Sequence, residues 1–156
     1  MEQRIQFSQV SPEPVKALLA LEAYVRRSGL EHPLLHLVKL RASQINGCGY
    51  CIDMHTKDAR AAGETEQRLY CLSVWREAAF YSARERAALE WTEAVTLLPD
   101  TRDVPDDVYQ RVREQFSEKE LVDLNFCVVA INCWNRLCVP FRVPVGSYKV
   151  GEVPKL

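Results

Sequence analysis

Apolar residues recur at helical spacing along most of this 156-residue chain, and this periodicity constrains the fold more than any other feature. No alternation of apolar and polar residues, the pattern of a half-buried strand, precedes the C-terminal tail. We therefore expect an all-α protein. A chain of this length can bury one core without disulfides, so we expect a single domain over residues 1–156. Prolines and glycines predict a non-helical tail at 141–156, pinned to a neighbour.

Boundary signals divide the chain into six to seven expected helices. Ser82 with Glu85, and Ser117 with Glu120, have the spacing of capping boxes, which open helices. Gly47 suits the position just after a helix end, where the backbone often turns left-handed. The expected helices span about 12–29, 33–46, 49–63, 64–75, 83–98, 105–116 and 118–137.

The charge balance excludes several classes of partner. Twenty basic residues are scattered among 21 acidic ones, and the net charge is −1. We expect no binding to nucleic acid, which requires clustered Lys and Arg, and none to an anionic membrane. The N-terminus lacks the apolar stretch of a signal peptide, so we expect a cytoplasmic protein. In that reducing compartment the six cysteines are buried or working thiols rather than structural disulfides.

The most informative motif is a Cys-x-x-Cys pair followed by a histidine. Cys48, Cys51 and His55 are spaced i, i+3 and i+7, so a helix beginning near Cys48 places all three on one face. Two cysteines one turn apart can approach disulfide distance. A helix N-terminus stabilises a thiolate, and His55 can take or relay a proton, with Asp58 one turn further able to orient it. The spacing favours a redox-active thiol site.

Two other interpretations of the motif stay open on the residues alone. The cysteines could be a purely structural pair of buried thiols. Cys48, Cys51 and His55 could also bind zinc with His36 as a fourth ligand, although zinc sites usually draw ligands from two separated segments. Attachment of a c-type haem is excluded because Ile52 stands where that motif requires histidine.

The motif and its surroundings resemble a known family. The matching segments are 40–48, 50–51, 53–56 and 58–60, and further matches lie at 75–77, 84–89, 131–132 and 134–136. They resemble the AhpD-like alkylhydroperoxidase branch of the carboxymuconolactone decarboxylase family. The resemblance implies an all-helical fold that associates into trimers or hexamers. It also implies peroxidase chemistry that uses no haem, flavin or metal.

The resemblance also implies a role for each residue. Cys51 would be the peroxidatic cysteine that attacks a hydroperoxide, Cys48 would resolve the sulfenic acid, and His55 would relay protons. A lipoyl- or thioredoxin-like dithiol would then reduce the disulfide. The residues alone leave the order of attack open, and the nearness of Cys51 to His55 favours the family's order.

One position departs from the family pattern. The family has a glutamate twelve residues before the first cysteine, and this chain has His36 there. An antiparallel hairpin turning at Gly47 places residue 36 opposite about residue 58, close to His55. An imidazole can pass a proton, but it lacks the fixed negative charge that would hold His55 protonated. We expect His36 to belong to the site and to alter the relay.

Two further functions remain alternatives to a peroxidase: decarboxylation of a muconolactone, and a non-catalytic redox-sensing oligomer. The decarboxylase is disfavoured because such members do not depend on a Cys-x-x-Cys pair. The four other cysteines have no paired spacing and lie on apolar faces, so we expect them to be core thiols: Cys71, Cys127, Cys133 and Cys138.

Overall fold

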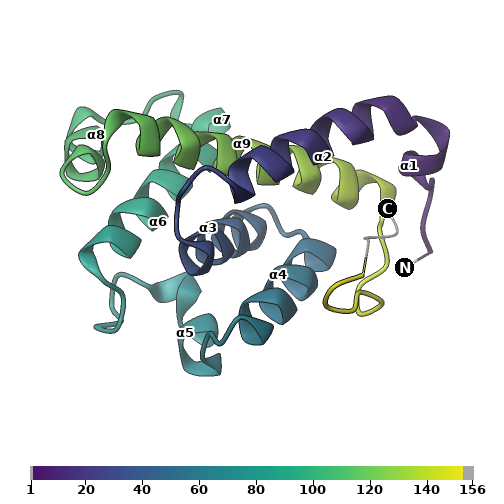
Figure 1. Ribbon diagram of the computed structural model, residues 1–156, viewed down its shortest axis with the longest axis horizontal. Coiled ribbons are helices and arrows are strands. Elements are labelled where there is room, and N and C mark those ends of the chain that lie inside the picture. Colours follow the sequence, from purple (N-terminus) through teal and green to yellow (C-terminus); the bar gives the residue numbers. More distant parts are fainter. Residues whose placement is uncertain (1, 153–156) are drawn as a thin grey trace.

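The structure, a computed structural model, describes residues 2–152 and contains only helices and connecting segments over that range (Figure 1). The helices are α1 (Phe7–Val10), α2 (Pro12–Arg26), α3 (His32–Ile45), α4 (Gly49–Ala61), α5 (Glu66–Tyr70), the 3₁₀-helix η1 (Leu72–Val74), α6 (Ala83–Thr96), α7 (Leu98–Thr101), α8 (Asp106–Arg113) and α9 (Glu118–Phe141). The prediction of an all-α protein is therefore confirmed.

All seven expected helical segments are present, with three differences. The segment 64–75 is split into α5 and η1. Two single-turn helices, α1 and α7, were not expected because one turn carries no detectable periodicity. Helix α9 passes through Pro140 and ends one turn later than predicted.

Helix α9 continues one residue beyond Pro140, and other segments bind its last carbonyl groups. The backbone N–H of Arg4 donates to the carbonyl of Phe141 (3.0 Å), and its guanidinium donates to that of Pro140 (3.1 Å). Arg142 then adopts a left-handed conformation with φ of 55°, and the N–H of Val143 donates to Cys138 (3.1 Å). The expected tail thus begins one residue late; its described part, 142–152, is non-helical, and residues 153–156 lie outside the described residues.

Helix α9 forms the centre of the fold. It runs along the long axis of the molecule and contacts α2, α3, α4, α6 and α8 (Figure 1). By length and composition alone α9 is apolar enough to cross a membrane. Its buried face, which includes Leu124, Val128 and Ile131, instead packs inside the helical assembly. Helix α3 packs against α4, α6 and α9, so the α3–α4 hairpin is held on its α3 side.

A buried carboxylate explains several residues on which the family resemblance depended. Glu93 on α6 accepts hydrogen bonds from Arg41 (2.7 Å) and from the indole of Trp75 (2.8 Å), and it also pairs with Arg76. Burial alone would raise the pKa of Glu93, but the hydrogen bonds from Arg76, Trp75 and Arg41 outweigh it and lower the pKa. This charged network joins α3, the segment after η1, and α6.

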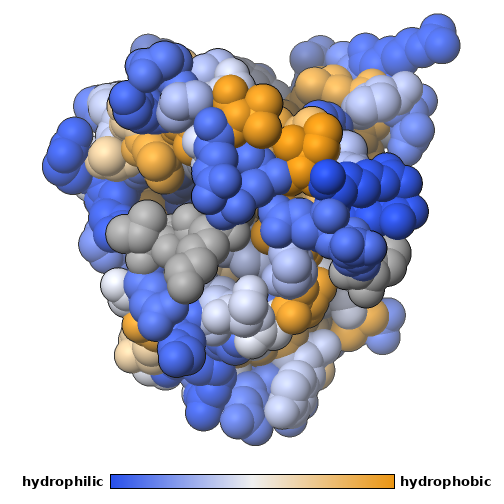
Figure 2. Space-filling view, turned by 90° about the vertical axis from the view of Figure 1, so that its right-hand side faces the viewer, coloured by the Kyte–Doolittle hydropathy of each residue, from blue (hydrophilic) through white to orange (hydrophobic). Residues whose placement is uncertain are grey.

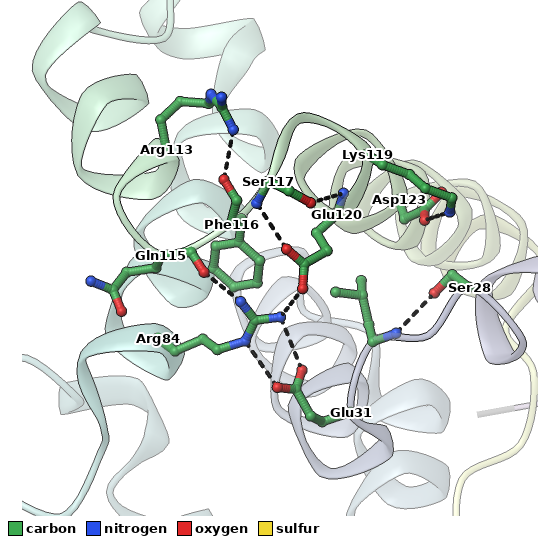
Figure 3. A network of polar contacts seen from close by, with 11 residues as sticks. Ser28, Glu31, Arg84, Arg113, Gln115, Phe116, Ser117, Lys119, Glu120 and Asp123 are labelled. Carbon is green, nitrogen blue, oxygen red and sulfur yellow. Dashed lines mark hydrogen bonds and ion pairs between the residues drawn. The ribbon is translucent and has the colours of Figure 1, made fainter.

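A second network joins three helices through one arginine. Arg84 on α6 donates to Glu31 before α3 (2.9 Å), to Glu120 of the α9 capping box (2.7 Å) and to the carbonyl of Gln115 (Figure 3). Its guanidinium lies 4.0 Å from the centroid of the Phe116 ring. Arg84 therefore orients the starts of α3 and α9 relative to α6.

Replacing Arg84 tests how much this network stabilises the fold. Arg84→Ala should lower the free energy of unfolding by about 2 kcal/mol, because the carboxylates and the carbonyl lose a charged donor. The matched control is Arg111→Ala, which removes exposed ion pairs with Glu90 and Asp107 and should cost less than about 1 kcal/mol. Urea unfolding measures both. Equal losses in the two variants would contradict the role given to Arg84.

Candidate active site

The turn between α3 and α4 sets the position of the cysteine pair. Helix α3 ends in a Schellman motif, in which the N–H of Gly47 donates to Gln44 (3.3 Å) and that of Cys48 to Ser43 (3.0 Å). Gly47 has a φ of +65°, a left-handed conformation that glycine adopts without strain. The chain therefore reverses at Gly47, as predicted, and α4 returns antiparallel beside α3.

An amide network fixes this turn against α9. The Asn46 side chain donates to Oδ1 of Asn132 (3.0 Å) and to Oδ1 of Asn135 (2.8 Å). Asn135 in turn donates to the hydroxyl of Ser43 (3.1 Å), and Asn132 to that of Thr96 on α6 (3.1 Å). Because these partners come from α3, α6 and α9, the turn before Cys48 has one defined position.

The two cysteines of the motif lie at the beginning of α4. Cys48 is the N-cap residue, and its sulfur accepts the backbone N–H of Cys51 (3.4 Å). The sulfurs are joined as a disulfide, with the Cα atoms 5.4 Å apart, so the expected pairing is present. In the reduced protein the same helix N-terminus favours the thiolate over the thiol.

A pocket of about 720 Å³ opens beside this pair. Its wall includes Cys51, His55 and His36, whereas Cys48 is buried and does not line the pocket. The remaining lining residues come from α2, α3, α4, α9 and the C-terminal segment: Leu19, Glu22, Arg26, His32, Leu35, Lys39, Tyr50, Met54, Asp58, Trp134, Cys138, Tyr148, Gly151 and Glu152. Of the two sulfurs, that of Cys51 is the one a molecule in the pocket would meet.

His55 is buried in the wall of the pocket, with 6% of its surface exposed. Burial first, and then the positive charges of Lys39 and His36, lower the pKa of His55 well below its ordinary value. Its Nε2 atom has no hydrogen-bond partner among the described residues. A neutral imidazole with a free nitrogen can accept a proton or a hydrogen bond from a neighbouring thiol or a bound molecule.

His36 lies in the same pocket, where the expected hairpin geometry places it. Burial is the main cause that lowers the pKa of His36, and the nearby carboxylate of Asp58 opposes it. Asp58 accepts a hydrogen bond from the hydroxyl of Tyr148 (2.8 Å). Both histidines therefore face the pocket mainly as neutral groups at neutral pH.

The pocket wall also contains a partly buried ion pair that sequence reasoning missed. Lys39 on α3 pairs with Glu22 on α2, which also accepts the indole N–H of Trp134 (3.1 Å). Residues 22 and 134 are far apart in sequence, and only the packing of α2 on α9 brings them together. Lys39 contributes to the depressed pKa of His55, so this pair belongs to the electrostatics of the site.

The C-terminal segment folds back onto α4, as the expectation of a pinned tail required. Lys57 donates to the carbonyl of Tyr148 (2.9 Å), and the N–H of Gly146 donates to Asp53 (3.2 Å). Figure 2 faces the end of the molecule that carries α1 and this segment, where apolar side chains form separate patches in a largely hydrophilic surface. Because the C-terminal segment is held against α4, it supplies Tyr148 to the pocket wall.

The remaining cysteines divide into distinct environments, which corrects the expectation of four core thiols. Cys127 and Cys138 are buried, but Cys71 is half-buried and Cys133 is exposed on α9. Cys138 also lies beside the disulfide: the sulfurs of Cys48, Cys51 and Cys138 are within 4.8 Å of one another. Its 87-residue separation from the motif left no sequence signal.

The zinc site considered from sequence has a different composition in the structure. The sulfurs of Cys48 and Cys51 group with Cys138, and neither His55 nor His36 joins such a three-donor group among the described residues. The four-ligand site made of both cysteines and both histidines is therefore not assembled.

The buried histidines predict a pH dependence of stability. Unfolding exposes His55, whose pKa then returns to about 6.5, so the unfolded chain binds a proton that the folded site does not. The free energy of unfolding therefore has its highest value above this pH. As the pH falls below it, the free energy of unfolding decreases by at most about 1.4 kcal/mol per pH unit for one site. Urea unfolding of the oxidised protein at pH 7.5 and 5.5 should show the decrease.

His55→Asn should remove most of this decrease, and His36→Asn a smaller part because His36 is less buried. His32→Asn, at the exposed start of α3, is the control and should retain it. If the free energy of unfolding of His55→Asn falls between pH 7.5 and 5.5 as much as that of the wild type, His55 is not a buried neutral group in the folded protein.

Comparisons with known proteins agree with this architecture. The curated protein YdfG of Bacillus subtilis (strain 168), itself uncharacterized, is 48% identical over 139 residues, which are 89% of this chain and 94% of the relative. A crystal structure from Agrobacterium tumefaciens, of unknown function but suggested to be the antioxidant defence protein AhpD, superposes with a TM-score of 0.90. The two sequences are 47% identical, and the superposition covers 94% of this chain and 100% of the Agrobacterium chain.

More distant structures share the fold alone. The debrominase Bmp8 superposes with a TM-score of 0.80 at 16% identity, over 89% of this chain and 74% of the Bmp8 chain.

The model of the carboxymuconolactone decarboxylase family matches residues 12–94, which contain α2 to most of α6 and the whole cysteine motif. With the AhpD-like neighbours, this match shows that the chain belongs to the AhpD-like branch of the carboxymuconolactone decarboxylase family.

Proposed function

We propose that this protein is a thiol peroxidase that reduces hydroperoxides through a dithiol–disulfide cycle of Cys48 and Cys51. The observation that carries the proposal is the pocket in which Cys51 and the free nitrogen of His55 lie together, with Cys48 paired to Cys51 behind them. Membership of a family with AhpD-like relatives supports an antioxidant role.

In the first step Cys51 attacks the peroxide. His55 accepts the thiol proton, and the thiolate, stabilised by the N-terminus of α4, forms a bond to the terminal oxygen of the hydroperoxide. The O–O bond breaks, and the leaving alkoxide takes the proton from His55 to become an alcohol. Cys51 is then a sulfenic acid. A neutral His55 suits this role because it is free to accept the proton.

In the second step Cys48 resolves the sulfenic acid. Its sulfur bonds to that of Cys51, and the hydroxyl leaves with a proton as water, which gives the observed disulfide. An external dithiol then exchanges with the disulfide, is itself oxidised, and returns both cysteines to thiols. We propose a lipoyl- or thioredoxin-like dithiol as this donor, because the pocket gives access to Cys51.

His36 would replace the family's glutamate as the second member of the relay. It lies in the pocket, and in its protonated form its positive charge lowers the pKa of His55. A carboxylate at this position would raise the pKa of His55, whereas His36 lowers it. We therefore propose a relay that is slower than the family pattern and shifted in pH.

An exposed apolar face of α9 is suited to contact between subunits. Val122, Phe126 and Val129 form an exposed apolar row on α9, next to Tyr24 of α2, whose ring packs edge-on against Phe126. Their spacing places them on one face of the helix. We propose that this face contributes to a homo-oligomer, a trimer or hexamer as the family resemblance implies, and that the protein acts in the cytoplasm.

Cysteine variants test the cycle directly. Cys51→Ser should reduce the consumption of cumene hydroperoxide, measured with dihydrolipoamide as donor, to the uncatalysed rate. Cys48→Ser should also stop turnover, but Cys51 should then accumulate as a sulfenic acid that dimedone labels. Cys133→Ser, at an exposed site away from the pocket, is the control and should retain wild-type turnover. Unchanged consumption by Cys51→Ser would refute the peroxidase proposal.

Variants of His36 test the relay. His36→Glu should raise the turnover number and shift its pH profile to higher pH, because a carboxylate stabilises protonated His55. His36→Gln has the same shape without the charge and should show neither effect. If the glutamate variant is no faster than the glutamine variant, the departure from the family pattern does not limit the relay.

A further inference from the structure

A third thiol lies beside the motif and is not needed for the proposed cycle. Cys138 projects from α9, so the cluster with Cys48 and Cys51 joins two helices, and all three sulfurs are buried and within 4.8 Å of one another. Three sulfurs bonded to one atom at about 2.3 Å in a trigonal arrangement lie about 4 Å apart. After reduction of the disulfide, these side chains have the spacing to bind one atom together.

The surroundings of the cluster favour a neutral complex. The cysteines pack among apolar residues that include Ala42, Ile131 and Val143. Cys138 itself is buried, with 3% of its surface exposed. Lys39, a cation of the pocket wall, is already paired with Glu22. A complex with a net negative charge would therefore be poorly compensated here.

We propose that the reduced protein binds trivalent arsenic through Cys48, Cys51 and Cys138. Arsenite is the neutral molecule As(OH)₃ at neutral pH, and it condenses with three thiols. Three As–O and three S–H bonds break, three As–S bonds form, and three water molecules leave with all the protons. Nothing is oxidised or reduced, and the product is neutral.

Other thiophilic ions fit the cluster less well. Zinc prefers four ligands in a tetrahedral arrangement, and neither His55 nor His36 belongs to the three-donor group. Zinc or copper(I) bound by three thiolates would also leave a negative charge in an apolar environment. Arsenic(III) takes three sulfur ligands and leaves no charge.

The pocket gives arsenite a route to the cluster. Cys51 and Cys138 both line the pocket, so a small neutral molecule can reach these two sulfurs before the third bond forms with Cys48. The carboxylates of Glu22 and Asp58 in the wall would repel an anion but not neutral As(OH)₃. Bound arsenic would hold Cys48 and Cys51 reduced and prevent disulfide formation.

The test uses the reduced full-length protein and two arsenic reagents. Arsenite can take three sulfurs, whereas phenylarsine oxide can take only two. The intact mass of wild-type protein treated with arsenite should show an adduct that has lost three waters, with three fewer titratable thiols. In Cys138→Ala the adduct should have lost only two waters, with two fewer titratable thiols, and the affinity for arsenite should fall at least about tenfold. Phenylarsine oxide should bind both proteins equally.

Control variants and a metal titration keep the test decisive. Cys133→Ser, also on α9 but exposed, should bind arsenite as the wild type does. If Cys138→Ala is unfolded, two other measurements still decide whether the third thiol binds arsenic: the adduct formed by Cys138→Ser, and the number of titratable thiols that the wild type loses. The proposal would be overturned if the wild-type adduct lacked only two waters, or if the wild type and Cys138→Ala bound arsenite with equal affinity. It would also be overturned if the wild type bound one equivalent of zinc but no arsenite. Because binding is measured without peroxide, the result is separate from that of the peroxidase assay.

Discussion

The site depends above all on the side-chain amide of Asn46, which bridges the end of α3 to Asn132 and Asn135 on α9. These hydrogen bonds hold the turn at Gly47, and the turn determines where α4 begins. Because Cys48 is the N-cap of α4, its position and that of Cys51 follow from the turn. A buried amide that lost its partners would carry a cost in free energy, so the network selects one arrangement of the hairpin.

The pocket combines a charged wall with nearly neutral reactive groups. Lys39 and Glu22 form a partly buried pair, whereas His55 and His36 are held neutral by burial and by nearby positive charge. The environment thus favours a base that is free to accept a proton over a permanent charge. The same neutrality underlies the proposed affinity of the three thiols, including Cys138, for a neutral arsenic species.

Much of the fold and of the site could be predicted from the chain because the signals are local. Capping boxes at Ser82 and Ser117 mark the starts of α6 and α9, and both are present. The spacing of Cys48, Cys51 and His55 also holds within one helix. The end of α9 was placed too early because Pro140 lies within its last turn, and Arg4, which is distant in sequence, binds the terminal carbonyl groups of Pro140 and Phe141.

By itself, the sequence determined the helical class, the hairpin turn at Gly47, and the grouping of the cysteine pair with His55, all through interactions between residues a few positions apart. Only the tertiary structure decided what surrounds that group. The packing of α9 and α2 brings Cys138, Trp134 and Glu22 to the pocket, and the folded C-terminal segment adds Tyr148. The physical reason is that these contacts arise from burial of apolar helix faces, which is non-directional and leaves no spacing in the sequence to identify the partners.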